Sequence, residues 1–395
     1  IQAARGMIPA DLVLRNANVF CPFTCSWETG DLAIKDGIVL GTGDYSGTTE
    51  EDLAGKYIVP GLIDAHVHIE SSLLTPREYA RLVARHGTTT VIADPHEIAN
   101  VAGAVGLDYM LEEREGAAID IRYMLPSCVP ATPVDVGGAV LSARDLRAFS
   151  GHEGILGLGE MMNFPGVLAG DPEVMAKIGI CPVRDGHAPF LNGKDLNAYI
   201  LAGLQSEHEC TVHAEAEEKL KGGMYIYLRE GSTERNIEAL APLVTPLTAP
   251  RCCFATDDCH ADLLMNDGHI DRCIRRAVAC GIPVELALRM ATLSAAERFG
   301  LHDRGALAPG RRADFCIVSD PKTFMVERVF ISGREFTGSV PVPPKTLPVS
   351  FRCSVPSSGD IRIDRKGTAR VIGLIPHQIV TESLLREWDG TARPG

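Results

Sequence analysis

The sequence lacks the features that mark a membrane-spanning or secreted protein. No run of about 18 apolar residues could cross a bilayer, and the opening residues, IQAARGMIPADLVL, contain no apolar signal-peptide core. Twelve cysteines are scattered along the chain without a CxxC pair. This pattern is typical of reduced thiols rather than of a disulfide framework. We therefore expect a cytoplasmic protein with no membrane partner.

Positive charge is also scarce. The 395 residues include 38 Lys and Arg against 51 Asp and Glu, which gives a net charge of −13. Proteins that bind nucleic acid through its phosphates need clustered Lys and Arg, so we expect no nucleic-acid partner. No GxGxxG motif follows the first strand predicted in the middle of the chain, which argues against a dinucleotide-binding sheet.

The middle of the chain alternates between predicted strands and predicted helices. Eight apolar runs have the pattern of strands: GLIDAHVH, TTTVIADPH, IDIRYMLPSC, GILGLGEMM, GICPVRDGH, SEHECTVH, MYIYLREGS and RCCFATDD. Helical patterns such as TPREYARLVARHG and DRCIRRAVACG lie between most of them. The alternation predicts an α/β fold with a parallel sheet, and eight strands in about 240 residues fit a (β/α)8 TIM-like barrel. A doubly wound sheet is the alternative.

Two β-rich pieces flank this predicted barrel. Residues 1–58 and 305–335 carry short apolar runs broken by Asn, Asp and Gly, which is the chemistry of hairpins. We expect them to pair into one small β-sandwich domain, with the barrel at residues 59–304. Residues 336–395 are expected to be a Pro-rich linker and a fragment of a C-terminal α/β domain, because TARVIGLIPHQIVTESLLREW has the pattern of a strand followed by the start of a helix.

Polar residues gather at the ends of the predicted strands. The apolar stretch VPGLIDAHVHIESS contains His66 and His68, and alternate residues of a strand share a face. Both imidazoles can therefore reach one point inside the barrel mouth, where the active sites of such barrels lie. The other strand ends carry Asp94, His96 and Glu97 (second), Glu160 (fourth), Asp185 and His187 (fifth), His208 and Glu209 (sixth), and Asp257 and Asp258 (eighth).

Histidine and carboxylate together suit Zn, Fe or Mn. Glu160 is the only acid at the end of the fourth strand, so it is the candidate bridge between two metal ions. Such metals would lower the pKa of a bridging water, and Asp257 could ligate one metal and accept the proton of that water. We favour His208 over His213 as a ligand, because His213 lies where a helix should begin. The pattern predicts hydrolysis at a polarised carbon without an organic cofactor.

Longer motifs resemble a known family. VPGLIDAHVHIESS resembles the first-strand motif of the amidohydrolase superfamily, and MATLSAAERFGLHDRGALAPGRRADFCIV resembles its closing segment. TTTVIADPHEIANVAG, DGHAPFLNGKDLNAYILAGLQSEHEC and ATDDCHADLLMNDGHIDRCIRRAV narrow the likeness to the adenine deaminase family. The resemblance covers roughly residues 10–335 and, faintly, 369–386. It implies conversion of adenine and water to hypoxanthine and ammonia in purine salvage, by a homo-oligomer, either a dimer or a tetramer.

The resemblance also implies a site with two divalent metal ions, Mn or Fe in most of the family and Zn as a further option. Carried onto this sequence, it assigns His66 and His68 to the buried metal, His187 and His208 to the second, Glu160 to the bridge, and Asp257 to ligation and proton transfer. A metal-bound hydroxide would attack C6 of adenine.

The roles of the remaining polar residues stay open. Glu97 or His96 could protonate the departing ammonia. Together with Asp94 they could instead contact the substrate or hold an extra metal. Glu209 and Asp258 are expected to orient the ligands beside them.

Two rival functions remain. The nearest is another amidohydrolase that acts on a different aminopurine, a pyrimidine or a cyclic amide, since a carboxylate-bridged site does not identify the leaving group. A non-catalytic barrel scaffold is the other, but such a protein should have lost metal ligands, and this sequence keeps all six.

Family members usually carry a further C-terminal domain after the segment that resembles RVIGLIPHQIVTE.

Overall fold

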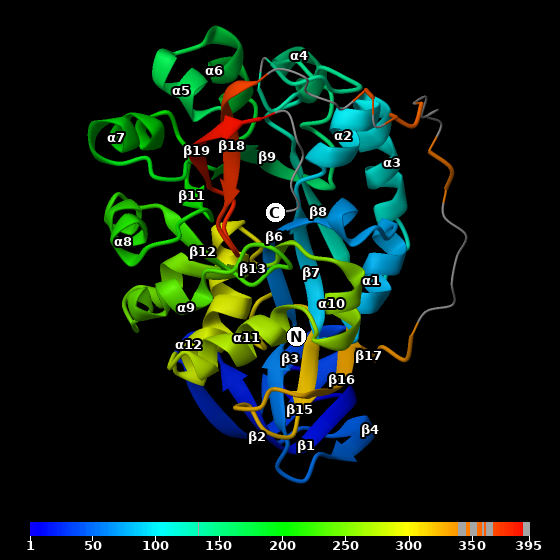
Figure 1. Ribbon diagram of the computed structural model, residues 1–395. Coiled ribbons are helices and arrows are strands. Elements are labelled where there is room, and N and C mark those ends of the chain that lie inside the picture. The colour runs from blue at the N-terminus through cyan, green and yellow to red at the C-terminus, as the bar shows by residue number, and fades with distance from the viewer. Residues whose placement is uncertain (133, 339–344, 348–353, 358, 361–365, 390–395) are drawn as a thin grey trace.

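The computed structural model describes every residue except 133, 339–344, 348–353, 358, 361–365 and 390–395. A barrel of parallel strands occupies its middle, and a β-sheet domain lies against one end of that barrel (Figure 1). Among the described residues, no helix combines the length and the apolar character that crossing a bilayer requires.

Eight parallel strands form the barrel, as the alternation predicts. They are β6 (Leu62–His68), β7 (Thr88–Ala93), β8 (Asp120–Leu125), β9 (Ile155–Met161), β10 (Arg184–Gly186), β11 (Ser206–Glu207), β12 (Tyr225–Arg229), and an eighth strand interrupted at one residue, β13 (Cys252–Ala255) and β14 (Asp257–Asp258). Hydrogen bonds join β10-β9-β8-β7-β6-β14 in one sheet and β11-β12-β13 in another. Because β14 pairs with β6, the eighth strand returns to the first.

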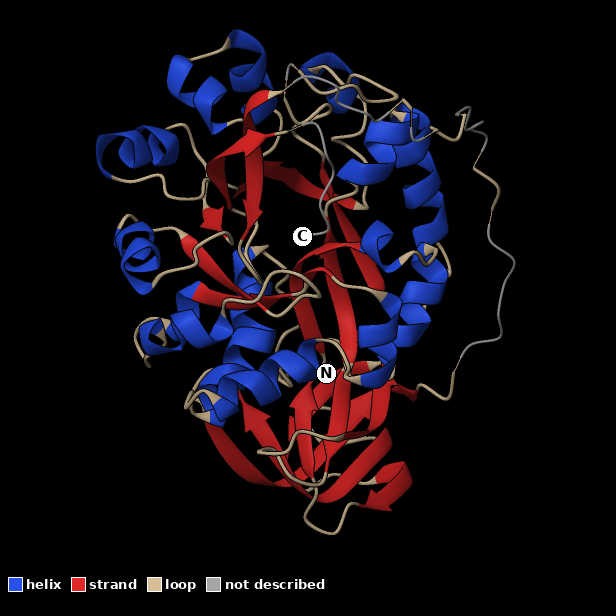
Figure 2. Cartoon of the chain, viewed as in Figure 1, coloured by secondary structure: helices blue, strands red, loops and turns tan. Residues whose placement is uncertain are grey.

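Helices cover the outside of these strands (Figure 2). They are α1 (Pro76–Ala84), α2 (His96–Ala102), α3 (Ala104–Arg114), α4 (Ala143–Arg147), α5 (Phe164–Ala169), α6 (Pro172–Ile178), α7 (Gly193–Leu201), α8 (His213–Lys221), α9 (Ile237–Leu240), α10 (Ala261–Asn266) and α11 (Ile270–Ala279). With helices outside and packed side chains inside, β6 and β7 are buried at every residue. This explains why neither strand alternates between apolar and exposed polar residues. α12 (Val284–Arg289) and α13 (Ala295–Arg298) lead out of the barrel.

Local sequence accounts for individual helices. α1 begins at a proline, and the hydroxyl of Thr75 accepts the backbone N–H of Glu78, which caps the first turn. α11 buries Ile270, Ile274 and Ala277, which recur at four and three residues and so form one apolar stripe against the strands.

The β domain is built from both flanks of the barrel, as predicted. Its strands are β1 (Ala10–Cys21), β2 (Ser26–Lys35), β3 (Ile38–Thr42), β4 (Gly47–Asp52) and β5 (Tyr57–Pro60) before the barrel, and β15 (Phe315–Val318), β16 (Val326–Ile331) and β17 (Arg334–Glu335) after it. β15 pairs antiparallel with β5, with Cys316 opposite Val59. All eight strands belong to one hydrogen-bonded sheet, so the chain leaves and re-enters the same domain.

The C-terminal segment differs from the prediction. Where the sequence pattern indicates the start of a helix, TESLLREW forms a strand: β18 (Gly367–Leu374) and β19 (Thr381–Trp388) make an antiparallel hairpin. Helix propensity over so short a segment is weak, and the adjacent strand places a partner residue opposite each of its eight residues. The carbonyl of His377, between the two strands, accepts the N–H of Arg235 beyond β12. Much of the predicted linker lies outside the described residues.

Candidate metal centre

The polar residues at the strand ends converge in the barrel mouth. His66 and His68 come from β6, Glu160 from β9, and Asp257 from β14, while His208 directly follows β11. All five are buried. His187, the residue after β10, is partly buried beside them. Parallel strands place their C-terminal ends at the same end of a barrel, and for this reason residues nearly 200 positions apart in the chain can meet there.

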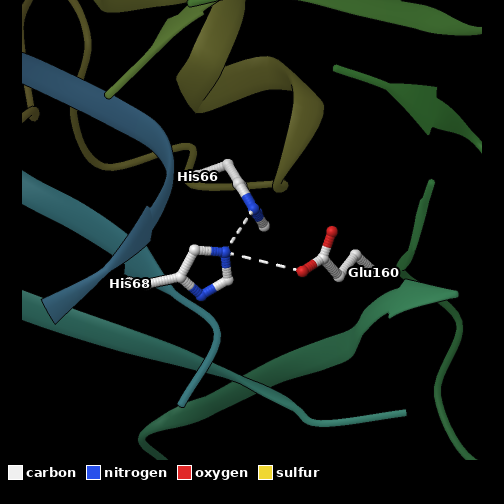
Figure 3. A group of neighbouring side chains, drawn as sticks. All are labelled: His66, His68 and Glu160. Carbon is white, nitrogen blue, oxygen red and sulfur yellow. Dashed lines mark hydrogen bonds and ion pairs between the residues drawn. The ribbon is translucent and has the colours of Figure 1, made fainter. Parts of the chain in front are cut away.

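His66 and His68 aim their rings at a common point (Figure 3). Their Nε2 atoms lie 3.1 Å apart, and the Nε2 of His68 lies 3.5 Å from Glu160 Oε1. The Nδ1 of His68 is 2.9 Å from the carbonyl oxygen of Asp94. Because a carbonyl oxygen can only accept, Nδ1 carries the proton and the lone pair of Nε2 faces the centre. Two ring nitrogens this close suit a shared cation.

A second pair of histidines meets the other oxygen of Glu160. Its Oε2 lies 2.6 Å from His187 Nδ1 and 3.0 Å from His208 Nε2. The ligand atoms of Glu160, His187 and His208 all lie within 4.8 Å of one another, as do those of His66, His68 and Glu160. Glu160 therefore presents one oxygen to each group, which is the arrangement that a carboxylate bridge between two cations requires.

Asp257 completes the centre from the eighth strand. Its Oδ1 lies 3.2 Å from His68 Nε2 and 3.7 Å from His66 Nε2. Its Oδ2 accepts a hydrogen bond from Arg229. Burial would raise the pKa of Asp257, but the Arg229 guanidinium and the two histidines hold it well below the ordinary value. The carboxylate therefore stays ionised.

Arg229 is a residue that the sequence analysis missed. It ends β12, is 1% exposed, and makes paired hydrogen bonds of 2.7 Å with both oxygens of Glu209 as well as its bond to Asp257. Glu209 thus reaches the centre partly through Arg229, which links the sixth strand to the eighth. The available signal was a positive charge at the end of an otherwise apolar strand in MYIYLREGS.

Asp94 supports two of the central residues. Its Oδ2 accepts the N–H of Glu160 at 2.9 Å, and its carbonyl oxygen accepts from His68. Burial raises the pKa of Asp94 to about 7. These contacts give Asp94 a positioning role. Its other carboxylate oxygen, Oδ1, lies 3.9 Å from His96 Nδ1.

His96 and Glu97 extend from the centre toward solvent. His96 Nδ1 lies 3.2 Å from Glu160 Oε1, and its Nε2 lies 3.1 Å from Glu97 Oε1. The Glu97 side chain is 34% exposed, the most open of this group. His68, His96 and Glu97 have ligand atoms close enough for a metal. However, the Nδ1 of His68 already binds the Asp94 carbonyl, so the contacts favour a row of ion-pair contacts from Glu160 through His96 to Glu97 over an extra metal site.

Glu70 is a second residue that sequence reasoning missed. Its Oε1 accepts the N–H of Ile98 at 3.2 Å and so supports the first turn of α2, which carries His96 and Glu97. Burial and the nearby carboxylate of Glu97 raise the pKa of Glu70 to about 8. The acid in HVHIE therefore lies beside the centre.

The structure separates the remaining candidates. His213 is the first residue of α8. Among the described residues, His208 belongs to groups of side chains close enough to share a metal ion, and His213 does not. Asp185 lies deeper and accepts hydrogen bonds from Ser206 and Arg298. Asp258 accepts a hydrogen bond from the hydroxyl of Ser71, in the short 3-10 helix Ile69–Ser72 that follows β6.

Comparison with known proteins agrees with this geometry. Residues 57–336 match the model of the amidohydrolase family. The chain is 65% identical to the adenine deaminase of Methanoregula boonei, in an alignment that spans 100% of this chain and 71% of that protein. It is 62% identical to the adenine deaminase of Methanoculleus marisnigri over 92% of this chain and 70% of that protein. The chain belongs to the adenine deaminase family of amidohydrolases.

Solved structures support the fold of this amidohydrolase. A crystal structure of an adenine deaminase superposes with a TM-score of 0.58 at 16% identity, covering 83% of this chain and 99% of that one. The N-acetyl-D-glucosamine-6-phosphate deacetylase of Mycobacterium smegmatis gives 0.58 at 19% identity, covering 82% of this chain and 100% of that one. The shared fold places the strand ends, while the buried His, Glu and Asp donors of this chain fit divalent metal ions.

Proposed function

We propose that this amidohydrolase deaminates adenine, converting adenine and water to hypoxanthine and ammonia. The observation that carries the proposal is the Glu160 carboxylate between two pairs of histidines. The chain that holds it is 65% identical to a named adenine deaminase over 100% of this chain and 71% of that protein. Purine salvage is the role such a reaction serves. A homodimer or homotetramer is the assembly that we expect.

Six residues would hold two divalent ions, with Mn or Fe favoured and Zn as a further option. His66 and His68 would hold one ion and His187 and His208 the other, with Glu160 between them and Asp257 on the side of the first pair. Bound there, such ions would lower the pKa of a water molecule and supply hydroxide near neutral pH.

Asp257 is suited to accept the proton of the attacking water. Its Oδ1 faces the Nε2 atoms of His66 and His68, while Arg229 holds its other oxygen. The guanidinium therefore fixes the orientation of the carboxylate and keeps it ionised, which a general base requires.

His96 and Glu97 are suited to the departing amino group. They form a chain from Glu160 to the more exposed edge of the mouth, where a purine ring would enter. In the reaction the C6–oxygen bond forms and the C6–nitrogen bond breaks, and the amino group leaves as ammonia after it receives a proton. We assign that proton donation to Glu97 or to His96.

Ammonia release tests the proposal directly. Protein loaded with Mn²⁺ is incubated separately with adenine, guanine, cytosine and adenosine, and free ammonia is measured over time. We expect release from adenine alone. Release from another of these bases instead would favour the rival amidohydrolase activity, and no release from any substrate, with two metals bound per chain, would contradict the proposal.

A further inference from the structure

The carboxylate of Glu207 lies directly behind the second pair of histidines. Its Oε1 accepts the backbone N–H of His208 at 3.0 Å and that of Glu209 at 2.7 Å. Its Oε2 accepts the N–H of Ala188, the residue after His187, at 2.9 Å. One fully buried carboxylate thus holds the backbone of two neighbouring strand ends, each of which carries one histidine of the pair.

Lys219 of α8 joins Glu207 from outside the strands. Its side chain is 0% exposed, and Nζ lies 2.9 Å from Glu207 Oε2, 2.7 Å from the carbonyl oxygen of Ala188 and 2.6 Å from Glu215 Oε1. Three acceptors match the three protons of the ammonium group. Glu215 Oε1 also accepts the N–H of Phe190, so α8 contacts the segment after His187 at one further point.

Stability alone is a weak reason for such an arrangement. Lysine is almost never fully buried unless it is paired, and a buried ion pair is often no more stabilising than apolar residues of the same volume. The backbone groups that this pair contacts belong instead to His208, Glu209 and Ala188, at or beside the two histidines. The geometry therefore favours a role in fixing where those two rings lie.

We propose that Glu207, Lys219 and Glu215, together called the α8 clamp, position His187 and His208 and so set the affinity for the metal ion that this pair would hold. The inference rests on the proposed metal centre. The clamp residues are positioning residues, because they act through the two histidines. Partners that orient metal ligands typically change affinity about 10- to 100-fold when they are removed.

The effect should be confined to one of the two ions. The first pair of histidines has different supports: His68 donates to the Asp94 carbonyl, and the N–H of His66 is held by Asp64 Oδ1 at 3.1 Å. Neither support involves α8. Loss of the clamp should therefore raise the dissociation constant of one ion and leave that of the other unchanged.

Metal titration of the Lys219→Met variant tests this. The metal-free chain of 395 residues is titrated with Mn²⁺ against a competing chelator, which yields two dissociation constants. We expect one of the two constants to rise about 10- to 100-fold while the other changes less than about twofold. Lys221→Met is the matched control, because Lys221 lies on the same helix, also pairs with a glutamate four residues earlier, and is 71% exposed. Its two constants should equal those of the wild type.

Each other outcome is informative. Two unchanged constants in Lys219→Met would overturn the clamp and leave the metal centre intact. Equal weakening of both would also overturn it, because it would indicate general damage to the barrel. A wild type that binds no Mn²⁺ would contradict the proposed function instead. Glu207→Gln, which keeps the shape and removes one acceptor facing Ala188 and Lys219, should show the same selective loss, and it decides the matter if circular dichroism shows that Lys219→Met does not fold.

Discussion

At the scale of single residues, the centre depends on which atom of each side chain faces which neighbour. Glu160 has Oε1 near His68 and Oε2 near His187 and His208, and its own N–H donates to Asp94. A carboxylate has two equivalent oxygens for these two groups. An amide has only one oxygen, and its nitrogen would turn N–H groups toward ring nitrogens or a cation.

We therefore expect Glu160→Gln to lose metal and activity. Turnover of adenine should fall more than about 100-fold, because a ligand itself matters more than the partners that orient it. Metal content per chain, measured by mass spectrometry after purification without chelator, should drop below that of the wild type. Glu153→Gln is the control, since Glu153 precedes the same strand and its side chain is 82% exposed. Near-normal turnover in Glu160→Gln would exclude the bridging role.

The sequence predicts the members of the centre better than their supports. His66, His68, Glu160 and Asp257 were predictable because a strand has a period of two and the strand ends of a barrel converge. Arg229, Glu70 and Lys219 were not, because their partners lie on other elements and a buried charge looks like any other charge in the sequence. Which residues orient the ligands is decided by packing between elements.

At the scale of elements, β9 carries a glycine where the centre leaves no room for a side chain. A Cβ atom on Gly159 would lie 2.0 Å from Asp94 Oδ2 and 2.6 Å from its Cγ. The carboxylate of Asp94 occupies this space because it accepts the N–H of Glu160, the next residue. The Asp94 carboxylate can therefore pack against the end of β9 only because residue 159 is a glycine.

Gly159→Ala should displace either Asp94 or the end of β9. We expect turnover of adenine to fall about 10- to 100-fold, as for other losses of support around metal ligands. The steady-state rate and the metal content measure this, with far-ultraviolet circular dichroism as the check on folding. Gly151→Ala is the control, because a Cβ there meets nothing within 4 Å. Wild-type kinetics in Gly159→Ala would show that the contact with Asp94 is dispensable.

Element by element, alternation in the sequence predicts the barrel strands well. Helical patterns separate most of the predicted strands, and each of them contains an observed one, although β10 and β11 are only three and two residues long. The prediction was wrong at TESLLREW. The local pattern indicates a helix, but the segment forms a strand that pairs with β18. Long-range pairing of that kind leaves little trace in a short window of sequence.

At the scale of the whole molecule, buried charges connect the barrel to the segment that returns to the β domain. Arg304 donates to Asp120 Oδ2 at 2.6 Å and to the hydroxyl of Thr90 at 3.0 Å. Arg122 also donates to Asp120. Burial would raise the pKa of Asp120, but Arg304 and Arg122 hold it below the ordinary value of 3.8.

Asp120→Asn should destabilise the protein in a pH-dependent way. A carboxyl with a lowered folded pKa stabilises fully above its unfolded pKa, and this contribution disappears as pH falls through the folded pKa. At pH 7 we expect the variant to lose about 3 kcal/mol in urea unfolding, the cost of removing one partner of a buried pair. The difference from the wild type should shrink below about pH 4. The exposed Asp108 of α3, changed to Asn, is the control. A difference that stays constant from pH 7 to pH 3 would contradict the assignment.

The pairing of β5 with β15 also bears on how a nascent chain reaches this fold. A ribosome adds about 5 to 20 residues each second, so the roughly 250 residues between these strands take about 13 to 50 seconds to make. During that interval β5 has emerged while its partner across the sheet has not been synthesised. An unpaired strand edge can recruit other chains. We therefore expect the edge of β5 that faces β15 to stay open to pairing with other chains until β15 has been translated.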